Sequence, residues 1–348
     1  MYKTFDRLQK LANLPLMTGF YLTELGEARG KQELFTRQAP QKLKVLKEHA
    51  LVESAVSSNR IEGVEIEGKR VGTVIFGKSL LHNRDEEEIR GYRNALEVIH
   101  ENNKKLKLDT DLILKLHKLC RGDIWDAGEY KEKDVDIIET LPEGGSRIRF
   151  KTLAAAETPQ ALENLVNVWN ENLKQRQIPP LLALAAFNLD FLCIHPFRDG
   201  NGRVSRLLLL LTLYQCGYEA GRFISLEKLI EENKERYYET LEICSQGWHE
   251  NKHDPWPYIN FLLWIIKEAT SEFERRVDSL QTEKGAKTQC VLNAIQSFEG
   301  TFTVADIQSK CTAAGIDWIR KILKKERTAG RIECLGRGQQ ARWRKTVK

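Results

Sequence analysis

The sequence has no apolar run long enough to cross a membrane. Its longest apolar runs, residues 179–187 and 207–213, are much shorter than a bilayer span and predict buried core helices. The first residues lack the apolar segment of a signal peptide, and the chain contains no internal repeats or low-complexity tracts. With 41% apolar and 30% charged residues, the composition is typical of a globular protein with no membrane partner.

Closely paired cysteines are also missing. Seven cysteines lie scattered through the 348 residues, and no two of them form a Cys-x-x-Cys pair. This odd, scattered set argues against a disulfide framework and against a structural zinc site. It predicts a reducing compartment, and we expect a cytoplasmic protein.

The positive charge is unevenly distributed. The net charge is +5, but residues 301–348 carry 12 basic and 4 acidic residues, a surplus of +8, so the first 300 residues together carry −3. A basic C-terminal segment predicts an anionic partner, and nucleic acid and an acidic protein are the two alternatives.

Apolar residues recur at helical spacing along most of the chain. The spacing predicts helices at residues 31–60, 85–101, 110–120, 158–173, 180–194, 202–216, 226–242 and 254–282. The first of these helices is expected to end near Glu62 and Gly63, because glycine readily adopts the left-handed conformation that closes a helix.

Two stretches depart from this pattern. Residues 135–140 and 147–150 predict short strands joined by a turn at 141–146. After a polar linker at 282–287, the spacing predicts helices at 289–298, 304–313 and 317–329 and strands at 331–335 and 340–343. This is the order of a winged helix, whose third helix and basic wing often contact DNA. Trp318 and Trp343 are expected in its core.

One short segment concentrates chemistry-bearing residues. It reads His195-Pro196-Phe197-Arg198-Asp199-Gly200-Asn201-Gly202-Arg203-Val204-Ser205-Arg206. A glycine-rich loop that leads into a helix presents free backbone N–H groups and a positive dipole end, which together favour an anion. Arg203 and Arg206 lie three residues apart on one helix face and suit phosphate. Asp199 suits Mg²⁺, and His195 can act as a general base.

The segment resembles the signature of Fic domain proteins, His-Pro-Phe-x-(Asp/Glu)-Gly-Asn-(Gly/Lys)-Arg-x-x-Arg, without departure. Fic proteins typically transfer the AMP of ATP to a hydroxyl side chain of a target protein. The resemblance implies that His195 deprotonates the hydroxyl, that Phe197 anchors the loop and that Asp199 holds Mg²⁺ against the α- and β-phosphates. It also implies phosphate contacts, which it assigns to Gly200, Asn201, Gly202, Arg203 (β-phosphate) and Arg206 (γ-phosphate). Gly202 favours the adenylylating branch, because the Doc branch has lysine there.

A second stretch, Ser58-Asn59-Arg60-Ile61-Glu62-Gly63, resembles the inhibitory motif of the same family, (Ser/Thr)-x-x-x-Glu-(Gly/Asn). The resemblance implies that Glu62 pairs with Arg206 and blocks the transfer-competent pose of the γ-phosphate. A carboxylate in the last turn of a helix opposes the helix dipole, so Glu62 gains from an external cation. An ordinary helix end with a solvated Glu62 is the alternative.

The predicted hairpin falls where the family places its flap, which holds the target backbone by strand addition. Ile137, Ile138 and Ile148 would form this flap, and a purely structural hairpin is the alternative. Lys131 stands where family members often have arginine. Tyr237 and Tyr238 match an Asn-x-x-x-Tyr-Tyr-x-x-Leu pattern of the family and are candidates to contact adenine, or to pack between helices.

The resemblance covers about residues 1–283 and completes the prediction. We expect a mainly α protein with a Fic helical core, a β-hairpin flap and a C-terminal winged helix. Its domains would be an N-terminal helical region with the inhibitory helix (1–105), a catalytic core (106–283) and the winged helix (286–348).

The expected function is autoinhibited transfer of AMP from Mg-ATP to Tyr, Thr or Ser of a target protein or of the chain itself. Transfer of another phosphate-containing group, removal of AMP and a nucleotide-sensing DNA-binding regulator are the alternatives. The oligomeric state stays open, with a homodimer among the alternatives.

Overall fold

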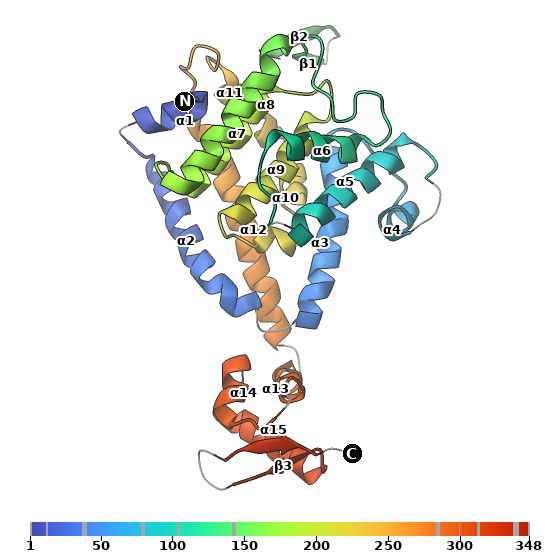
Figure 1. Cartoon of the computed structure of the whole chain (residues 1–348), viewed down its shortest axis with the longest axis vertical. Helices are drawn as coiled ribbons and strands as arrows, with labels where there is room; N and C mark the ends of the chain where they lie inside the picture. The colour runs from blue at the N-terminus through green and yellow to red at the C-terminus, as the bar shows by residue number, and fades with distance from the viewer. Residues whose placement is uncertain are drawn as a thin grey trace. The chain divides into compact units, whose positions relative to one another are not determined.

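Helices dominate the computed structural model of the chain, which Figure 1 shows as a ribbon. The structure describes residues 2–11, 13–36, 40–77, 81–102, 105–140, 144–282, 286–298, 300–311, 314–336 and 341–346. The chain divides into unit 1, Met1–Arg29 and Lys47–Thr270, and unit 2, Gly30–Leu46 and Ser271–Lys348. The prediction of a mainly helical fold with a short antiparallel hairpin is confirmed. Within the described ranges, no helix is both long and apolar enough to cross a membrane.

The centre of unit 1 is formed by the two apolar runs of the sequence. They lie on α8 (Pro180–Ile194) and α9 (Asn201–Gln215), whose side chains are almost all buried. Helix α8 packs against α7 (Thr158–Gln175) and α9, and α9 packs against α5 (Arg84–Asn102) and α6 (Thr110–Arg121). The loop between α8 and α9 is therefore held between rigid helices, and this loop is the His195–Arg206 segment.

The other helices border or extend this core. They are α1 (Lys3–Lys10), α2 (Leu16–Thr36), α3 (Pro40–Ile61), α4 (Gly68–Phe76), α10 (Leu226–Glu232), α11 (Lys234–Ser245) and α12 (Trp256–Thr282), with short 3₁₀ turns η1 (Ala155–Glu157) and η2 (Ala220–Arg222). Most predicted helices are confirmed to within a few residues, including the end of α3 just before Gly63, whose φ is +82°. Helices α1, α2 and α4 were not predicted as separate elements.

Two predicted helices are wrong as single elements. The helix expected at 31–60 is divided, since α2 ends at Thr36 and α3 starts at Pro40. Proline favours the first turn of a helix, where its missing N–H costs nothing. The helix expected at 226–242 is interrupted at Asn233, which has non-helical backbone angles between α10 and α11. Helical spacing of apolar residues continues across both breaks and therefore does not reveal them.

The hairpin of unit 1 consists of β1 (Asp136–Thr140) and β2 (Ser146–Lys151), paired antiparallel with an irregularity between Ile137 and Ile138. Gly144 and Gly145, at the end of the predicted turn, have φ values of +87° and +97°, which favour glycine. Residues 141–143 of that turn lie outside the described residues. Figure 1 shows the hairpin at the end of unit 1 where α8 and α11 also lie.

Unit 2 ends in the predicted order of helices and strands: α13 (Ala286–Gln296), α14 (Val304–Lys310), α15 (Ile316–Thr328), β3 (Ile332–Cys334) and β4 (Trp343–Lys345). Strand β4 starts at Trp343, the residue at which the predicted strand ended. Residues 337–340 lie outside the described residues. Trp343 packs against the core of this part, as expected. Trp318 is 38% exposed, so its assignment to the core was wrong.

The cysteine prediction also needs a correction. Cys290 on α13 and Cys311, just after α14, form a disulfide, and the other five cysteines are free. The two residues are 21 positions apart, and only the packing of α13 against α14 brings them together. Counting and local spacing of cysteines therefore did not reveal this pair.

Candidate active site

The His195–Arg206 segment begins at the end of α8. His195 closes this helix with a left-handed conformation (φ +52°), and its N–H donates to the Phe191 carbonyl at 3.0 Å. Gly200 has a φ of +84° and precedes the first residue of α9. A Cβ at position 200 would come within 3.2–3.4 Å of Arg121 and His117, so this turn favours glycine for its backbone and for space.

The loop between them is fixed by internal contacts. Phe197 is fully buried, as expected of an anchor, and its ring stacks on His117 with centroids 3.7 Å apart. The Asn201 side chain donates to the Phe197 carbonyl at 2.8 Å and accepts from the Phe197 N–H at 3.0 Å. Both the oxygen and the nitrogen of the Asn201 side-chain amide are thus used within the loop.

His117 on α6 is a structural partner that the sequence did not reveal. The Gly128 N–H donates to its Nδ1 at 2.9 Å, so the ring proton is on Nε2, which lies 3.0 Å from the Asp199 carbonyl oxygen. Burial lowers the pKa of His117 to about 4. The neutral ring therefore links the loop at Gly128 to the loop at Asp199 at physiological pH.

His195 has the protonation state that a base needs. Burial, and then the nearby Lys131 charge, lower its pKa to about 4, so the imidazole is neutral near pH 7. The Lys131 Nζ donates to the Ile194 carbonyl at 3.2 Å and to Thr152 Oγ1 at 2.8 Å. Lys131 therefore takes a buried position that connects the base of the hairpin to the residue before His195.

Arg203 and Arg206 project from the first turns of α9, as predicted, and both are only 2% exposed. Arg203 Nη1 donates to Glu88 Oε2 at 2.6 Å and to Asn59 Oδ1 at 3.3 Å. Arg206 donates to the Ser58 hydroxyl at 2.9 Å and to the Ser58 carbonyl at 2.8 Å. Arg206 Nη1 is buried and has no hydrogen-bond partner among the described residues.

Glu62 pairs with Arg206, the contact that the family resemblance implies. Its Oε1 accepts from Arg206 Nη2 at 2.8 Å, and its side chain keeps 31% of its surface exposed. A Cβ at position 202 would clash with Glu62 Oε1, so Gly202 is the residue that leaves space for this carboxylate beside α9. Ser58 and Glu62 together hold the Arg206 side chain.

Asp199 is the candidate metal ligand. Its side chain is 56% exposed, and its oxygens accept from Arg121 Nη1 and from the Gly200 N–H, each at 2.6 Å. Partial burial opposes ionisation, but the Arg121 and Arg203 charges outweigh it and lower the pKa of Asp199. The described residues contain no cluster of three or more metal-ligating side chains. One ionised carboxylate fits Mg²⁺, which commonly takes one or two protein carboxylates and completes its shell with phosphates and water.

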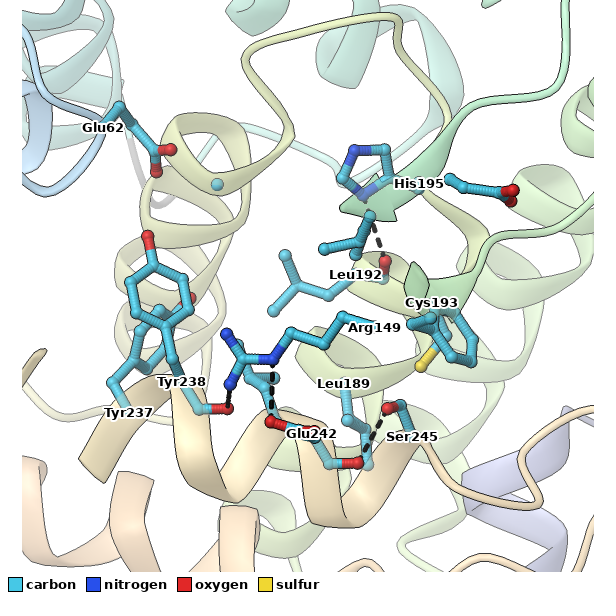
Figure 2. A pocket seen from close by; sticks show the side chains of 15 residues that line it. Glu62, Arg149, Leu189, Leu192, Cys193, His195, Tyr237, Tyr238, Glu242 and Ser245 are labelled. Atoms are coloured by element: carbon cyan, nitrogen blue, oxygen red, sulfur yellow. Dashed lines mark hydrogen bonds and ion pairs between the residues drawn. The ribbon is translucent and has the colours of Figure 1, made fainter. Parts of the chain in front are cut away.

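A cavity of about 320 Å³ opens beside these groups, and Figure 2 shows Glu62, His195, Tyr237 and Tyr238 around it. Its wall is largely apolar near Leu189, Leu192, Cys193 and Phe150. Tyr237 is 2% exposed and packs among other aromatic rings, whereas Tyr238 is only partly buried. The cavity therefore joins an apolar surface to the His195 ring and to the end of α9.

The hairpin borders the other side of this cavity. Ile137 lines it, but Ile138 and Ile148 are 61% and 53% exposed and do not. Glu242 on α11 holds β2 through Arg147 and Arg149, each with a 2.9 Å ion pair. Figure 2 shows Arg149 reaching from the hairpin to Glu242 and to the Tyr238 carbonyl.

Comparisons with known proteins find a family match in this part of the chain. Residues 107–213 match the model of the Fic/DOC family. The protein adenylyltransferase fic-1 of Caenorhabditis briggsae is 24% identical over 253 residues, which are 70% of this chain and 43% of the relative. The protein adenylyltransferase Fic of Drosophila erecta is 28% identical over 243 residues, 64% of this chain and 44% of the relative. The chain thus spans less than half the length of these relatives.

Solved structures show the same fold. A Fic family protein from Desulfovibrio desulfuricans G20 has a TM-score of 0.62 and 23% identity, and the match covers 97% of this chain and 98% of that one. A Fic domain containing signaling protein from Bacteroides thetaiotaomicron VPI-5482 has a TM-score of 0.62 and 22% identity, with 74% and 97% covered. Residues 107–213 thus match the Fic/DOC family, and the chain has the fold of these Fic structures.

Proposed function

We propose that the chain is a protein adenylyltransferase that transfers AMP from Mg-ATP to a Tyr, Thr or Ser hydroxyl of a target protein or of itself. The observation that carries this proposal is the neutral His195, which lies on the same cavity as the N-terminal end of α9. A proton acceptor beside a phosphate site is what hydroxyl attack on a phosphate requires. The curated relatives with similar sequences are named protein adenylyltransferases, which supports the same reaction.

In the proposed mechanism, the target hydroxyl oxygen would attack the α-phosphorus of ATP while His195 accepts its proton, and the bond between the α- and β-phosphates would break so that pyrophosphate leaves. Arg203 and Arg206 would bind the β- and γ-phosphates, and the backbone N–H groups of residues 200–202 would contact phosphate oxygens. Asp199 would hold Mg²⁺, which supplies charge neutralisation on the α- and β-phosphates. The apolar wall and Tyr238 would take the adenine ring, with Tyr237 packing behind it.

We further propose that Glu62 represses this activity at rest. Its carboxylate occupies Arg206, the cation that would otherwise bind the γ-phosphate. An ATP molecule would have to compete with an ion pair that the buried Arg206 already makes, so productive binding is disfavoured. The hairpin would hold the target backbone along the strand that carries the exposed Ile138 or Ile148.

The first test uses the full chain with Mg²⁺, cell lysate and each α-labelled nucleotide, ATP, CTP, GTP or UTP. Label from ATP is expected to increase in Glu62→Gly and to disappear in Glu62→Gly/His195→Ala. Glu65→Gly, in the loop after the motif, is the matched control and should behave as wild type. Label from another nucleotide would show that the transferred group is that nucleotide's monophosphate and not AMP. Absence of label with every nucleotide would favour phosphocholine transfer, removal of AMP or a regulatory role.

DNA binding by the C-terminal part is a second candidate function. Helix α15 is the third helix of a helix–helix–helix–hairpin order, the position of the recognition helix in a winged helix. Its exposed side chains include five cations: Arg320, Lys321, Lys324, Lys325 and Arg327. The exposed Trp318 ring lies under Lys321, with Nζ 4.8 Å from the ring centroid.

The charge on α15 supports a phosphate backbone as its partner. The test measures binding of the full chain to a labelled duplex at several salt concentrations. Lys321→Gln/Lys324→Gln/Lys325→Gln should weaken binding about tenfold or more and reduce the salt dependence. The control is Lys105→Gln/Lys107→Gln/Lys133→Gln, which removes the same number of charges at exposed lysines outside α15. Equal loss in both variants would exclude α15 as the DNA site, and no binding by the wild type would favour an acidic protein partner.

A further inference from the structure

A buried carboxylate outside the matched family segment holds the cations of the proposed phosphate site. We propose that Glu88 on α5 is a positioning residue for ATP: it orients Arg203, which would bind the β-phosphate, and Arg121, which contacts Asp199. This inference rests on the proposed function of the same site. Glu88 lies before residue 107, where the family match begins, and neither the sequence motif nor the comparisons assign it a role.

The contacts of Glu88 make it the centre of an ion-pair network. The residue is 3% exposed, and its Oε2 accepts from Arg203 Nη1 at 2.6 Å. Its Oε1 accepts from Arg121 Nη1 and from Arg84 Nε, each at 3.0 Å. Each carboxylate oxygen is thus committed to an arginine, and Arg121 and Arg203 are themselves almost fully buried.

Burial makes this carboxylate the nearest counter-ion of Arg203 and one of the counter-ions of Arg121. A buried guanidinium without a nearby anion is strongly disfavoured, because the protein interior solvates the charge poorly. The Nε atoms of Arg203 and Arg121 have no hydrogen-bond partner among the described residues. The orientation of each guanidinium therefore depends on its Nη contacts, and Glu88 supplies one of these to each arginine.

Arg121 and Arg203, which Glu88 binds, both also lie close to Asp199. Arg121 Nη1 lies 2.6 Å from Asp199 Oδ2, and Arg203 Nη2 lies 3.8 Å from Asp199 Oδ1. A chain of ion pairs thus connects α5, α6 and α9 to the residue that would hold Mg²⁺. Loss of the Glu88 charge would let both guanidinium groups turn and would remove the geometry that binds a triphosphate.

Glu86 offers a matched control on the same helix. It is also 3% exposed, and it makes two 2.8 Å hydrogen bonds to Arg70 in a bidentate ion pair. Among the described residues, the hydrogen bonds and ion pair of the Arg70 side chain go to Glu86 and not to the segment 195–206. Glu86→Gln and Glu88→Gln therefore remove the same charge from two buried glutamates that pair with arginine, of which only Glu88 pairs with an arginine of the proposed phosphate site.

The experiment measures the dissociation constants of ATP and AMP by calorimetry, with Mg²⁺, in the full-length Glu62→Gly protein. Glu88→Gln should weaken ATP about tenfold and change AMP less than about twofold, because AMP has no β- or γ-phosphate. Glu86→Gln should leave the ATP-to-AMP ratio of dissociation constants unchanged. A structural role alone would lower thermal stability without changing this ratio.

An unchanged ratio in Glu88→Gln, or an equal change in Glu86→Gln, would overturn the inference while the proposed function stands. If the Glu62→Gly protein binds neither nucleotide, the proposed function and the inference fail together. Glu88→Asp is the second variant if Glu88→Gln does not fold. Aspartate keeps the charge but is one methylene shorter. We expect this variant to weaken ATP binding more than AMP binding, by a smaller factor than Glu88→Gln does.

Discussion

Arg203 and Arg206 lie three residues apart on α9 and are equally buried, yet their carboxylate partners differ in kind. Glu88, the partner of Arg203, is 3% exposed and is shared with Arg121 and Arg84. Glu62, the partner of Arg206, lies just past the end of α3, and its side chain is 31% exposed. The first carboxylate is almost fully shielded from water, whereas the second can leave its arginine and become solvated.

The comparison shows how one type of ion pair can serve two purposes. Removing one member of a buried pair leaves an uncompensated charge and is strongly destabilising. A partly exposed pair contributes less, because solvent replaces the lost partner. We therefore regard Glu88–Arg203 as a fixed part of the phosphate site and Glu62–Arg206 as its removable block.

The largest expected difference is between the activities of the two carboxylate variants. Glu62→Gly should raise the rate of AMP transfer at least about tenfold, because Arg206 becomes available to the γ-phosphate. Glu88→Gln, introduced into that active variant, should lower the rate about tenfold or more. Steady-state transfer from labelled ATP measures both. Changes in the same direction would contradict the division into a fixed pair and a removable pair.

The next effect concerns the space that Glu62 occupies beside α9. Gly202→Ala should lower the melting temperature of the otherwise wild-type chain, because the new Cβ clashes with Glu62 Oε1. In the Glu62→Gly background the decrease should be much smaller, because the remaining close contact of the new Cβ is Arg206 Nη1 at 3.2 Å and alanine favours a helix over glycine by up to about 1 kcal/mol. Thermal denaturation of the four proteins measures this double-mutant cycle. Additive changes would show that Glu62 does not lie against Gly202.

The pH dependence of transfer tests the protonation state of His195 in the variant that lacks the Glu62–Arg206 pair. The acid limb of the Glu62→Gly pH profile should lie near pH 4 rather than 6.5, because burial and the Lys131 charge lower the pKa of His195 to about 4. Glu62 acts in the opposite direction and raises this pKa, so removing it cannot move the limb upward. As the pH falls through about 4, His195 becomes protonated and can no longer accept a proton. A limb at pH 6.5 or above would contradict a buried, neutral His195.

The smallest expected effect is a general loss of stability in acid. Burial lowers the pKa of His100 to about 3 and those of His117, His195 and His253 to about 4. The unfolded chain takes up protons at these residues near pH 6.5 and the folded protein does not, so stability falls as the pH drops from 6.5 to about 4. Asp190 acts oppositely, because burial raises its pKa to about 7. With four histidines against one carboxyl group, the melting temperature should fall by several degrees between pH 7 and pH 5. An increase would contradict these assignments.

The sequence predicts the local part of this site well and its long-range part poorly. The loop from His195 to Arg206 was predicted because a glycine-rich turn before a helix is a local feature, and the structure forms that turn. The Glu62–Arg206 contact was expected only from the family resemblance. Glu88 and Arg203 are 115 residues apart, and His117 and Asp199 are 82 apart, so no spacing rule connects them. The same limit explains why the Cys290–Cys311 pair was not predicted, whereas the break at Asn233 was missed because helical spacing of apolar residues continues across it.

The central claim is that a neutral His195 serves a phosphate site that Glu62 blocks. The most direct measurement compares AMP transfer from α-labelled ATP by wild type, Glu62→Gly and Glu62→Gly/His195→Ala at equal concentration. The account predicts weak transfer by the wild type, strong transfer by Glu62→Gly and none by the double variant. Equal transfer by wild type and Glu62→Gly, or transfer that survives without His195, would contradict it.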